Sequence, residues 1–205
     1  TLFRSVMDVE IVRLGEDFEA HRWDALFELA STLGATQVLV AGDDPQETRL
    51  AQHFGKVCEV MRPFGLTANL EFMPWTEVRD ARAAVRVLEA AGRPANAGVL
   101  IDALHFGRST TTLDDLRAIP REWLHYAQIC DASAGLNFST EALIQTARAE
   151  RQLPGEGSID LRGMMGVLPT ELPISVEIID VRREASHSPE EWATRCLQTS
   201  RAYTG

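Results

Sequence analysis

Short apolar runs rich in β-branched residues recur roughly every 25 to 35 residues, and segments with helical periodicity fill the intervals between them. A strict alternation of strands and helices predicts a parallel sheet with right-handed crossovers. The predicted strands are Val6–Val12, Thr36–Ala41, Leu66–Glu71, Ala97–Asp102, Leu124–Cys130 and Pro173–Ile179. The predicted helices are Phe18–Leu33, Pro45–Arg62, Thr76–Ala91, Leu113–Ala118, Ser139–Arg151 and Pro189–Tyr203.

Residues at the helix ends support these boundaries. Asp44 before Pro45 is predicted to cap a helix that has proline at its first position. The segment Ser188–Glu191 repeats this signal and adds acidic residues to the first turn. Three glycines follow predicted helices, where a left-handed residue is favoured: Gly34, Gly65 and Gly92.

The alternating pattern fits both an open sheet and a closed barrel. An open nucleotide-binding sheet usually has a glycine-rich turn after its first strand, whereas residues 14–17 contain a single glycine and two acids. This favours a (β/α)8 TIM barrel of which about six βα units are present and the first two are missing. Residues 1–5 are predicted to be a non-native or disordered leader, because they resemble a translated adapter, and residues 6–205 to be the partial barrel domain.

Composition excludes several classes of protein. The 45% hydrophobic and 24% charged residues are typical of an ordinary globular protein. No apolar run approaches the roughly 20 residues that span a bilayer, so we expect no membrane contact and a cytoplasmic location. A net charge of −10 argues against nucleic acid as a partner. The three cysteines are odd in number and widely spaced, which fits neither a disulfide framework nor a zinc knuckle, and they are expected to be buried thiols.

Polar side chains stand where four of the predicted strands end. They are Glu71, Asp102, Gln128 and Glu177, and His105 follows three residues after Asp102. In a parallel barrel these ends meet on one face, where active sites are built. Oxygen ligands of this kind suit Mn²⁺, Mg²⁺ or Co²⁺, although each carboxylate taken alone could instead cap the helix that follows it.

Several short motifs resemble the xylose-isomerase-like TIM-barrel superfamily of sugar phosphate isomerases and epimerases. They are Leu70-Glu71, the segment Ile101–His105, the segment Gln128–Asp131, the Arg151–Gly157 loop with Ile159-Asp160, and Val176-Glu177. The resemblance covers the chain after residue 5 and corresponds to the third through eighth strands of the barrel. It implies that Glu71, Asp102, Gln128 and Glu177 hold one divalent metal ion.

Gln128 departs from the usual pattern of this superfamily. Isomerases and epimerases usually have histidine at that position, whereas glutamine resembles the dehydratase branch, such as 3-dehydroshikimate dehydratase, with inosose dehydratase as a further comparison. The DNA-repair branch, endonuclease IV, uses more histidines and three metal ions. Five histidines and a strongly acidic balance exclude that branch here.

The resemblance implies an isomerase or epimerase acting on a sugar, sugar phosphate or related polyol through a metal-stabilised enediolate. Glu71 and Glu177 would lie on opposite faces of the substrate and exchange protons. In the alternative dehydratase, a lyase, His105 would remove the proton next to the carbonyl group. A third alternative is a non-catalytic barrel fragment, which could form a homo-oligomer through its open strand edges.

Four further residues are candidates for substrate binding. Arg151 could pair with a substrate carboxylate or phosphate, and Glu156 lies in the glycine-containing loop beside it. Asp131 could orient a ligand or a substrate hydroxyl, and Trp75 could form an apolar wall. The alternatives are a surface turn for the loop and a helix start packed on the barrel for Trp75.

Overall fold

The computed structural model describes residues 7–204, so the predicted leader and Val6 lie outside the described residues. The chain packs as two compact units that divide the fourth strand between them. The first unit comprises residues 7–100 and 121–125, and the second comprises residues 101–120 and 126–204. Within residues 7–204, no helix combines the length and the apolar character required to cross a membrane.

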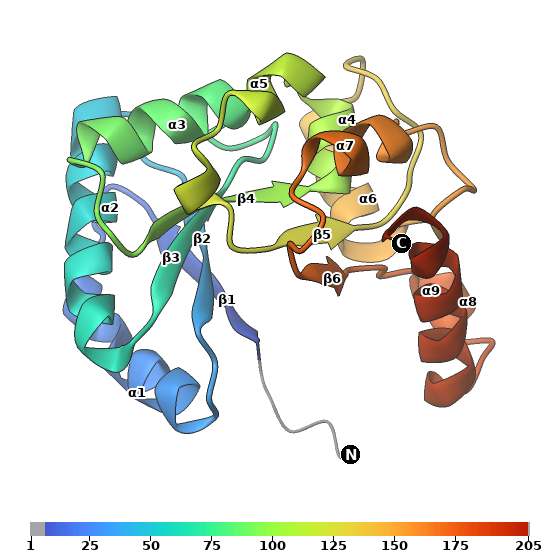
Figure 1. Cartoon of the computed structure of the whole chain (residues 1–205), viewed down its shortest axis with the longest axis horizontal. Helices are drawn as coiled ribbons and strands as arrows, with labels where there is room; N and C mark the ends of the chain where they lie inside the picture. The colour runs from blue at the N-terminus through green and yellow to red at the C-terminus, as the bar shows by residue number, and fades with distance from the viewer. Residues whose placement is uncertain (1–6, 205) are drawn as a thin grey trace. The chain divides into compact units, whose positions relative to one another are not determined.

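The first unit is a parallel sheet with helices along one side (Figure 1). Its strands follow one another in chain order, and each pairs with the next. The strands are β1 (Asp8–Leu14), β2 (Gln37–Gly42), β3 (Thr67–Glu71) and β4 (Ala97–Asp102), which continues into the second unit. The helices are η1 (Ala20–Trp23), α1 (Asp24–Thr32), α2 (Glu47–Met61), η2 (Arg62–Phe64), α3 (Ala81–Ala90) and η3 (Arg121–Trp123).

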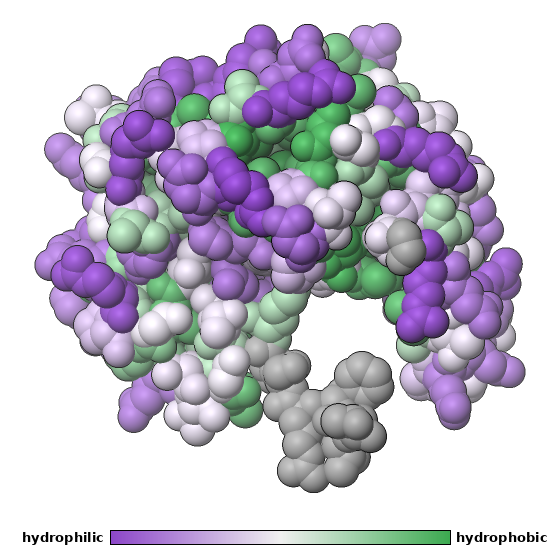
Figure 2. Space-filling model, in the orientation of Figure 1, coloured by the Kyte–Doolittle hydropathy of each residue, from purple (hydrophilic) through white to green (hydrophobic). Residues whose placement is uncertain are grey.

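The second unit continues the same parallel order from the end of β4. It contains the short strands β5 (Ala127–Ile129) and β6 (Ile174–Val176). Its helices are α4 (Ala103–Arg108), α5 (Leu113–Arg117), α6 (Thr140–Ala149), α7 (Leu161–Val167), α8 (Val181–Glu184) and α9 (Pro189–Thr204). The outer surface of α9 is mainly hydrophilic (Figure 2), and buried Trp192 and Cys196 mark its inner face.

The core forms where buried strands meet the apolar sides of the helices. Val38 and Val40 of β2 are fully buried, as are Phe54 of α2 and Leu88 of α3. Burial of each such side chain stabilises the fold by about 1.5–3 kcal/mol. Every residue of β4 is buried, as expected for an inner strand of a parallel sheet. This packing fixes the strand ends, and therefore the side chains that follow them.

Several predicted helix ends are confirmed. Gly34, Gly65 and Gly92 have φ angles of 79°, 70° and 83°, which are left-handed. Ser188 caps α9: its Oγ accepts a hydrogen bond from the Glu191 N–H at 3.2 Å, and the Glu191 carboxylate accepts one from the Ser188 N–H at 2.9 Å. The three cysteines are buried free thiols, as predicted.

The predicted cap at Asp44 is wrong. Helix α2 begins at Glu47, after Gln46, and Asp44 is fully buried two residues before that cap. Its carboxylate accepts hydrogen bonds from Arg49 at 2.6 and 2.9 Å and from the Gln46 N–H at 2.9 Å. The guanidinium group of Arg49 is therefore the main partner of this buried charge.

Strand ends and the shortest helices also differ from the prediction. β1 ends two residues later than expected, at Leu14, and β5 is limited to three residues. Helices α4, α7 and α8, of six, seven and four residues, were not predicted. Helix α4 begins directly at the end of β4, where the Asp102 carboxylate accepts a hydrogen bond from the His105 N–H.

Candidate metal and active site

Three of the four predicted metal ligands lie together in the second unit. Asp102, the last residue of β4, is in register with Gln128 of β5, so the two side chains share one face. Gln128 is in register with Ser175 of β6, and Glu177 follows two residues later. The Glu177 N–H also donates to the Ile129 carbonyl oxygen at 3.1 Å, which fixes the backbone at that strand end. Register therefore brings these oxygen-bearing side chains to one edge of the sheet.

Arg151 joins two of these side chains. It is only 2% exposed, and its Nη1 donates to Asp102 Oδ2 at 2.7 Å. Its Nη2 lies 3.1 Å from Glu177 Oε1. Its Nε donates to the Ala147 carbonyl oxygen, which holds the guanidinium plane in place. Arg151 is therefore a buried bridge between Asp102 and Glu177, and the surface-turn alternative is wrong for this residue.

The electrostatics of the cluster favour an ionised Asp102. Burial alone would raise the pKa of its carboxyl group, but Arg151, together with His105 and Glu177, outweighs burial and lowers that pKa. Burial likewise opposes the charge on Arg151, yet Asp102 and the other neighbours hold its pKa well above the ordinary value. Asp102 and Arg151 therefore form a buried ion pair. Removal of either partner would leave the other charge buried without compensation, which is strongly destabilising.

His105 is buried beside the same carboxylate. Burial lowers the pKa of its imidazole to about 4, against the opposing influence of Asp102. The ring is therefore neutral at neutral pH. Its Nε2 lies 4.0 Å from Asp102 Oδ1, which is too long for a hydrogen bond. A neutral ring nitrogen of this kind can accept a proton or bind a metal ion.

Asp131 uses its carboxylate to hold the glycine-containing loop. It is 2% exposed and accepts hydrogen bonds from the N–H groups of Ala132 at 2.8 Å, Gly155 at 2.9 Å and Ile159 at 3.2 Å. A Cβ atom on Gly157 would lie 2.3 Å from Asp131 Oδ1, so only glycine fits there. Asp131 thus fixes the loop that follows Arg151.

The remaining predicted substrate-binding residues are more accessible. Glu156, at the tip of this loop, is exposed and forms an ion pair with Arg183. Trp75 belongs to the first unit and is half-buried in the turn after β3.

Glu71, the fourth predicted metal ligand, ends β3 in the first unit. It is 3% exposed and in register with Ala41 of β2 on one side and Leu100 of β4 on the other. Leu100 stands two residues before Asp102 in the same strand. Glu71 is therefore the last residue of the strand that pairs with β4. This agrees with the prediction that the ends of the parallel strands meet on one face.

Arg13, which has no role predicted from the sequence, lies in β1 and pairs at 2.8 Å with Asp43, the residue that follows β2. The alternation of apolar and polar residues at the end of β1 could have indicated this residue. Val12 and Leu14 are apolar and fully buried, and Arg13 stands between them on the other face of the strand.

Comparisons with known proteins give the family of this chain. Residues 13–200 match the family described as xylose isomerase-like TIM barrel. No curated protein sequence matches. The structure resembles the IolI protein, solved with a zinc atom, with a TM-score of 0.76 and 18% identity over 94% of this chain and 76% of that one.

Other solved structures show the same fold. A xylose isomerase domain containing protein from Salmonella typhimurium has a TM-score of 0.75 and 13% identity over 98% of this chain and 76% of that one. D-allulose 3-epimerase from Methylomonas sp., solved with D-allulose, has a TM-score of 0.66 and 14% identity over 90% and 68%. The six parallel strands are accordingly those of a partial (β/α)8 barrel. The chain belongs to the xylose isomerase-like TIM barrel family.

Proposed function

We propose that this protein is a divalent-metal-dependent isomerase or epimerase that acts on a sugar or a related polyol. The observation that carries the proposal is the buried cluster in which Arg151 bridges Asp102 and Glu177 beside Gln128. Buried charges of this kind are costly to maintain and are typical of functional sites. Family membership, the zinc atom of IolI and the D-allulose of the Methylomonas epimerase support the same class of reaction.

The proposed ligands of the metal ion are Glu71, Asp102, Gln128 and Glu177. Their chemistry fits Mn²⁺, Mg²⁺ or Co²⁺, because all four offer oxygen atoms. Glu71 and Asp102 together with His105 also supply three groups able to hold a metal ion, and an imidazole ligand would suit zinc as well. A bound divalent ion would act as a Lewis acid on a carbonyl or hydroxyl oxygen of the substrate.

In the isomerase reaction, Glu71 and Glu177 transfer a proton to and from carbon on opposite faces of the substrate. Arg151 holds the Glu177 carboxylate in place and supplies a positive charge beside it. That charge stabilises negative charge on a nearby substrate oxygen as the proton leaves. Asp131 acts indirectly, by fixing the loop that carries Arg151.

A metal-dependent dehydratase is the second candidate, and two observations favour it. Gln128 replaces the usual histidine, and the neutral, buried imidazole of His105 can accept a proton. In this reaction His105 takes the proton and a hydroxyl group leaves the neighbouring carbon.

The first experiment is a thermal-melt titration with Mn²⁺, Mg²⁺, Co²⁺ and Zn²⁺. We expect a saturable rise in melting temperature that is lost in Glu177→Gln and kept in Glu156→Gln, the matched control outside the proposed ligand set. A rise of equal size in both variants would contradict Glu177 as a ligand. No rise with any of the ions in the unsubstituted protein would refute the metal site.

The second experiment separates the reactions. An isomerase or epimerase incubated with ketoses and Mn²⁺ in D₂O exchanges a carbon-bound proton for deuterium and conserves the mass of the remaining atoms. A dehydratase instead forms a conjugated, ultraviolet-absorbing product. His105→Asn should abolish the second reaction while Mn²⁺ binding to the four oxygen ligands persists. Neither exchange nor dehydration across a panel of sugars and dehydroshikimate-like acids would favour the non-catalytic alternative.

A further inference from the structure

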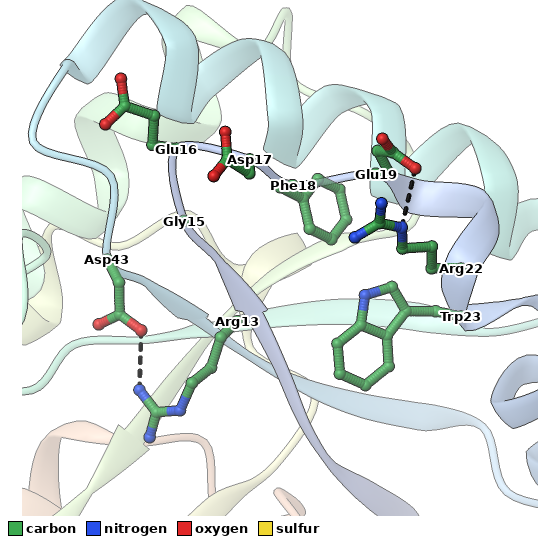
Figure 3. A pocket seen from close by; sticks show the side chains of 9 residues that line it. All are labelled: Arg13, Gly15, Glu16, Asp17, Phe18, Glu19, Arg22, Trp23 and Asp43. Atoms are coloured by element: carbon green, nitrogen blue, oxygen red, sulfur yellow. Dashed lines mark hydrogen bonds and ion pairs between the residues drawn. The ribbon is translucent and has the colours of Figure 1, made fainter.

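The first unit contains a pocket beyond the C-terminal end of β1, formed by the strand end, the loop that follows it and η1 (Figure 3). Its volume is about 550 Å³. Small-molecule sites usually measure about 300–1,000 Å³. The pocket is therefore large enough for a ligand of hexose size.

The pocket combines aromatic rings with paired charges, as Figure 3 shows. Trp23 of η1 is half-buried and presents its indole to the pocket, and Phe18 lies in the loop between β1 and η1. Arg13 Nη1 donates to Asp43 Oδ2 at 2.8 Å, and Arg22 Nε lies 2.8 Å from Glu19 Oε2. An aromatic ring packs against the apolar C–H face of a sugar, while guanidinium and carboxylate groups bond to its hydroxyls.

The register of the sheet relates this pocket to Glu71. Arg13 is in register with Ala41, and Ala41 is in register with Glu71, so the three residues form one row across β1, β2 and β3. Side chains in one row of a parallel sheet point to the same face. Two strand spacings separate Arg13 from Glu71, about 10 Å. Ala41 lies between them and contributes only a methyl group to that face.

The charge of the pocket decides which ligands it suits. Four carboxylates line it, from Glu16, Asp17, Glu19 and Asp43, against two guanidinium groups. Both guanidinium groups are already paired with carboxylates of the pocket, and Glu16 pairs with Arg49 at 3.1 Å, which leaves one negative charge in excess. A phosphate or carboxylate on the ligand would therefore meet an excess of negative charge, whereas hydroxyl groups would not.

We propose that this pocket is a subsite for the end of the substrate remote from its carbonyl group, and that it selects an uncharged polyol over a phosphorylated or acidic sugar. Arg13 and Asp43 bond to hydroxyls of that end, and Trp23 packs against its carbon chain or ring. The inference rests on the proposed function, because it takes Glu71 as part of the reacting end of the site.

Isothermal titration calorimetry of the Mn²⁺-loaded protein with D-fructose and D-fructose 6-phosphate tests this proposal. We expect Arg13→Met and Trp23→Leu each to weaken D-fructose binding about tenfold. Arg86→Met is the matched control, because Arg86 forms an exposed ion pair with Glu47 outside the pocket. It should bind D-fructose as the unsubstituted protein does.

Selectivity provides the sharper measurement. D-fructose 6-phosphate should bind the unsubstituted protein about tenfold more weakly than D-fructose. Asp17→Asn removes one negative charge of the pocket and should narrow that ratio about three- to tenfold, a change that a purely structural role would not produce. Tighter binding of the phosphate, or a ratio that Asp17→Asn leaves unchanged, would overturn the proposal.

The control for the proposed function is the Mn²⁺ melting shift, measured on the same samples. If Arg13→Met and Trp23→Leu keep both the Mn²⁺ shift and full D-fructose affinity, the subsite is refuted and the metal site stands. If the unsubstituted protein shows neither a Mn²⁺ shift nor sugar binding, the proposed function fails, and this inference fails with it.

Discussion

Replacing Arg151 by methionine tests the electrostatic account of the second unit. The substitution keeps much of the side-chain volume but removes the guanidinium group that lies 2.7 Å from Asp102 and 3.1 Å from Glu177. Asp102 is fully buried, so its carboxylate would remain without its main counter-charge. The variant should therefore be much less stable than the unsubstituted protein when no metal ion is bound.

The magnitude follows from burial. Removing one partner of a buried ion pair costs about 3–5 kcal/mol. The Glu177 side chain is 20% exposed, so water can compensate part of the second interaction, and the lower end of this range applies. We expect the free energy of unfolding to fall by about 3–4 kcal/mol. That is a large share of the roughly 5–15 kcal/mol that stabilises a typical domain.

The assay is urea unfolding in EDTA, with Arg183→Met as the matched control. Arg183 also pairs with two carboxylates, Glu156 and Asp180, but its side chain is 34% exposed. Its loss should cost about 1 kcal/mol or less. A divalent ion should restore part of the stability of Arg151→Met, since it neutralises the same carboxylates; at 100 times its Kd the gain is about 2.7 kcal/mol. Equal losses in the two variants would refute the account.

Three further predictions concern the same framework. In EDTA, the free energy of unfolding of the unsubstituted protein should fall as pH falls from about 6.5 towards 4. The reason is that the pKa of His105 is lowered to about 4 in the folded protein, so the unfolded chain binds the proton first. His105→Asn should flatten this part of the stability–pH profile, and an unchanged profile would count against a buried neutral imidazole. Asp131→Ala leaves the N–H groups of Ala132, Gly155 and Ile159 without this acceptor, so it should cost about 3 kcal/mol and expose the loop after Arg151 to proteolysis. A loop as resistant to proteolysis as before would show that the carboxylate does not hold it. Gly98→Ala would place a Cβ atom 2.4 Å from both Asn69 Oδ1 and His125 Cδ2. It should lower the free energy of unfolding by about 1–3 kcal/mol, measured by thermal melting. An unchanged stability would mean that these two side chains shift freely.

The strands and the positions of the candidate ligands could be predicted from the sequence because both follow local patterns. Apolar runs such as Ala97–Ile101 have too few polar residues for a surface strand, and Asp102 ends that run. Parallel pairing then brings the ends of neighbouring strands to one edge. This is why Asp102 and Gln128, 26 residues apart in the chain, are register partners.

Other features depend on which loop folds over which strand end. Whether Asp44 would cap a helix or bind Arg49 could not be decided from its neighbours, because both partners lie within five residues of it. The carboxylate of Asp131 was equally able to face a ligand or the backbone of the Arg151–Gly157 loop. The structure shows the second arrangement.

By itself, the sequence determined the alternation of strands and helices, the burial of the inner strands and the acidic and amide groups at the strand ends. The physical reason is that hydrophobic periodicity and helix-end chemistry act over a few residues and can be recognised locally. Only the tertiary structure decided that Arg151, 49 residues from Asp102, lies between Asp102 and Glu177. It also decided that Arg13, Asp43 and the loop after β1 line one pocket. Such contacts depend on how distant segments pack, because the energy of a buried charge is set by every group that surrounds it.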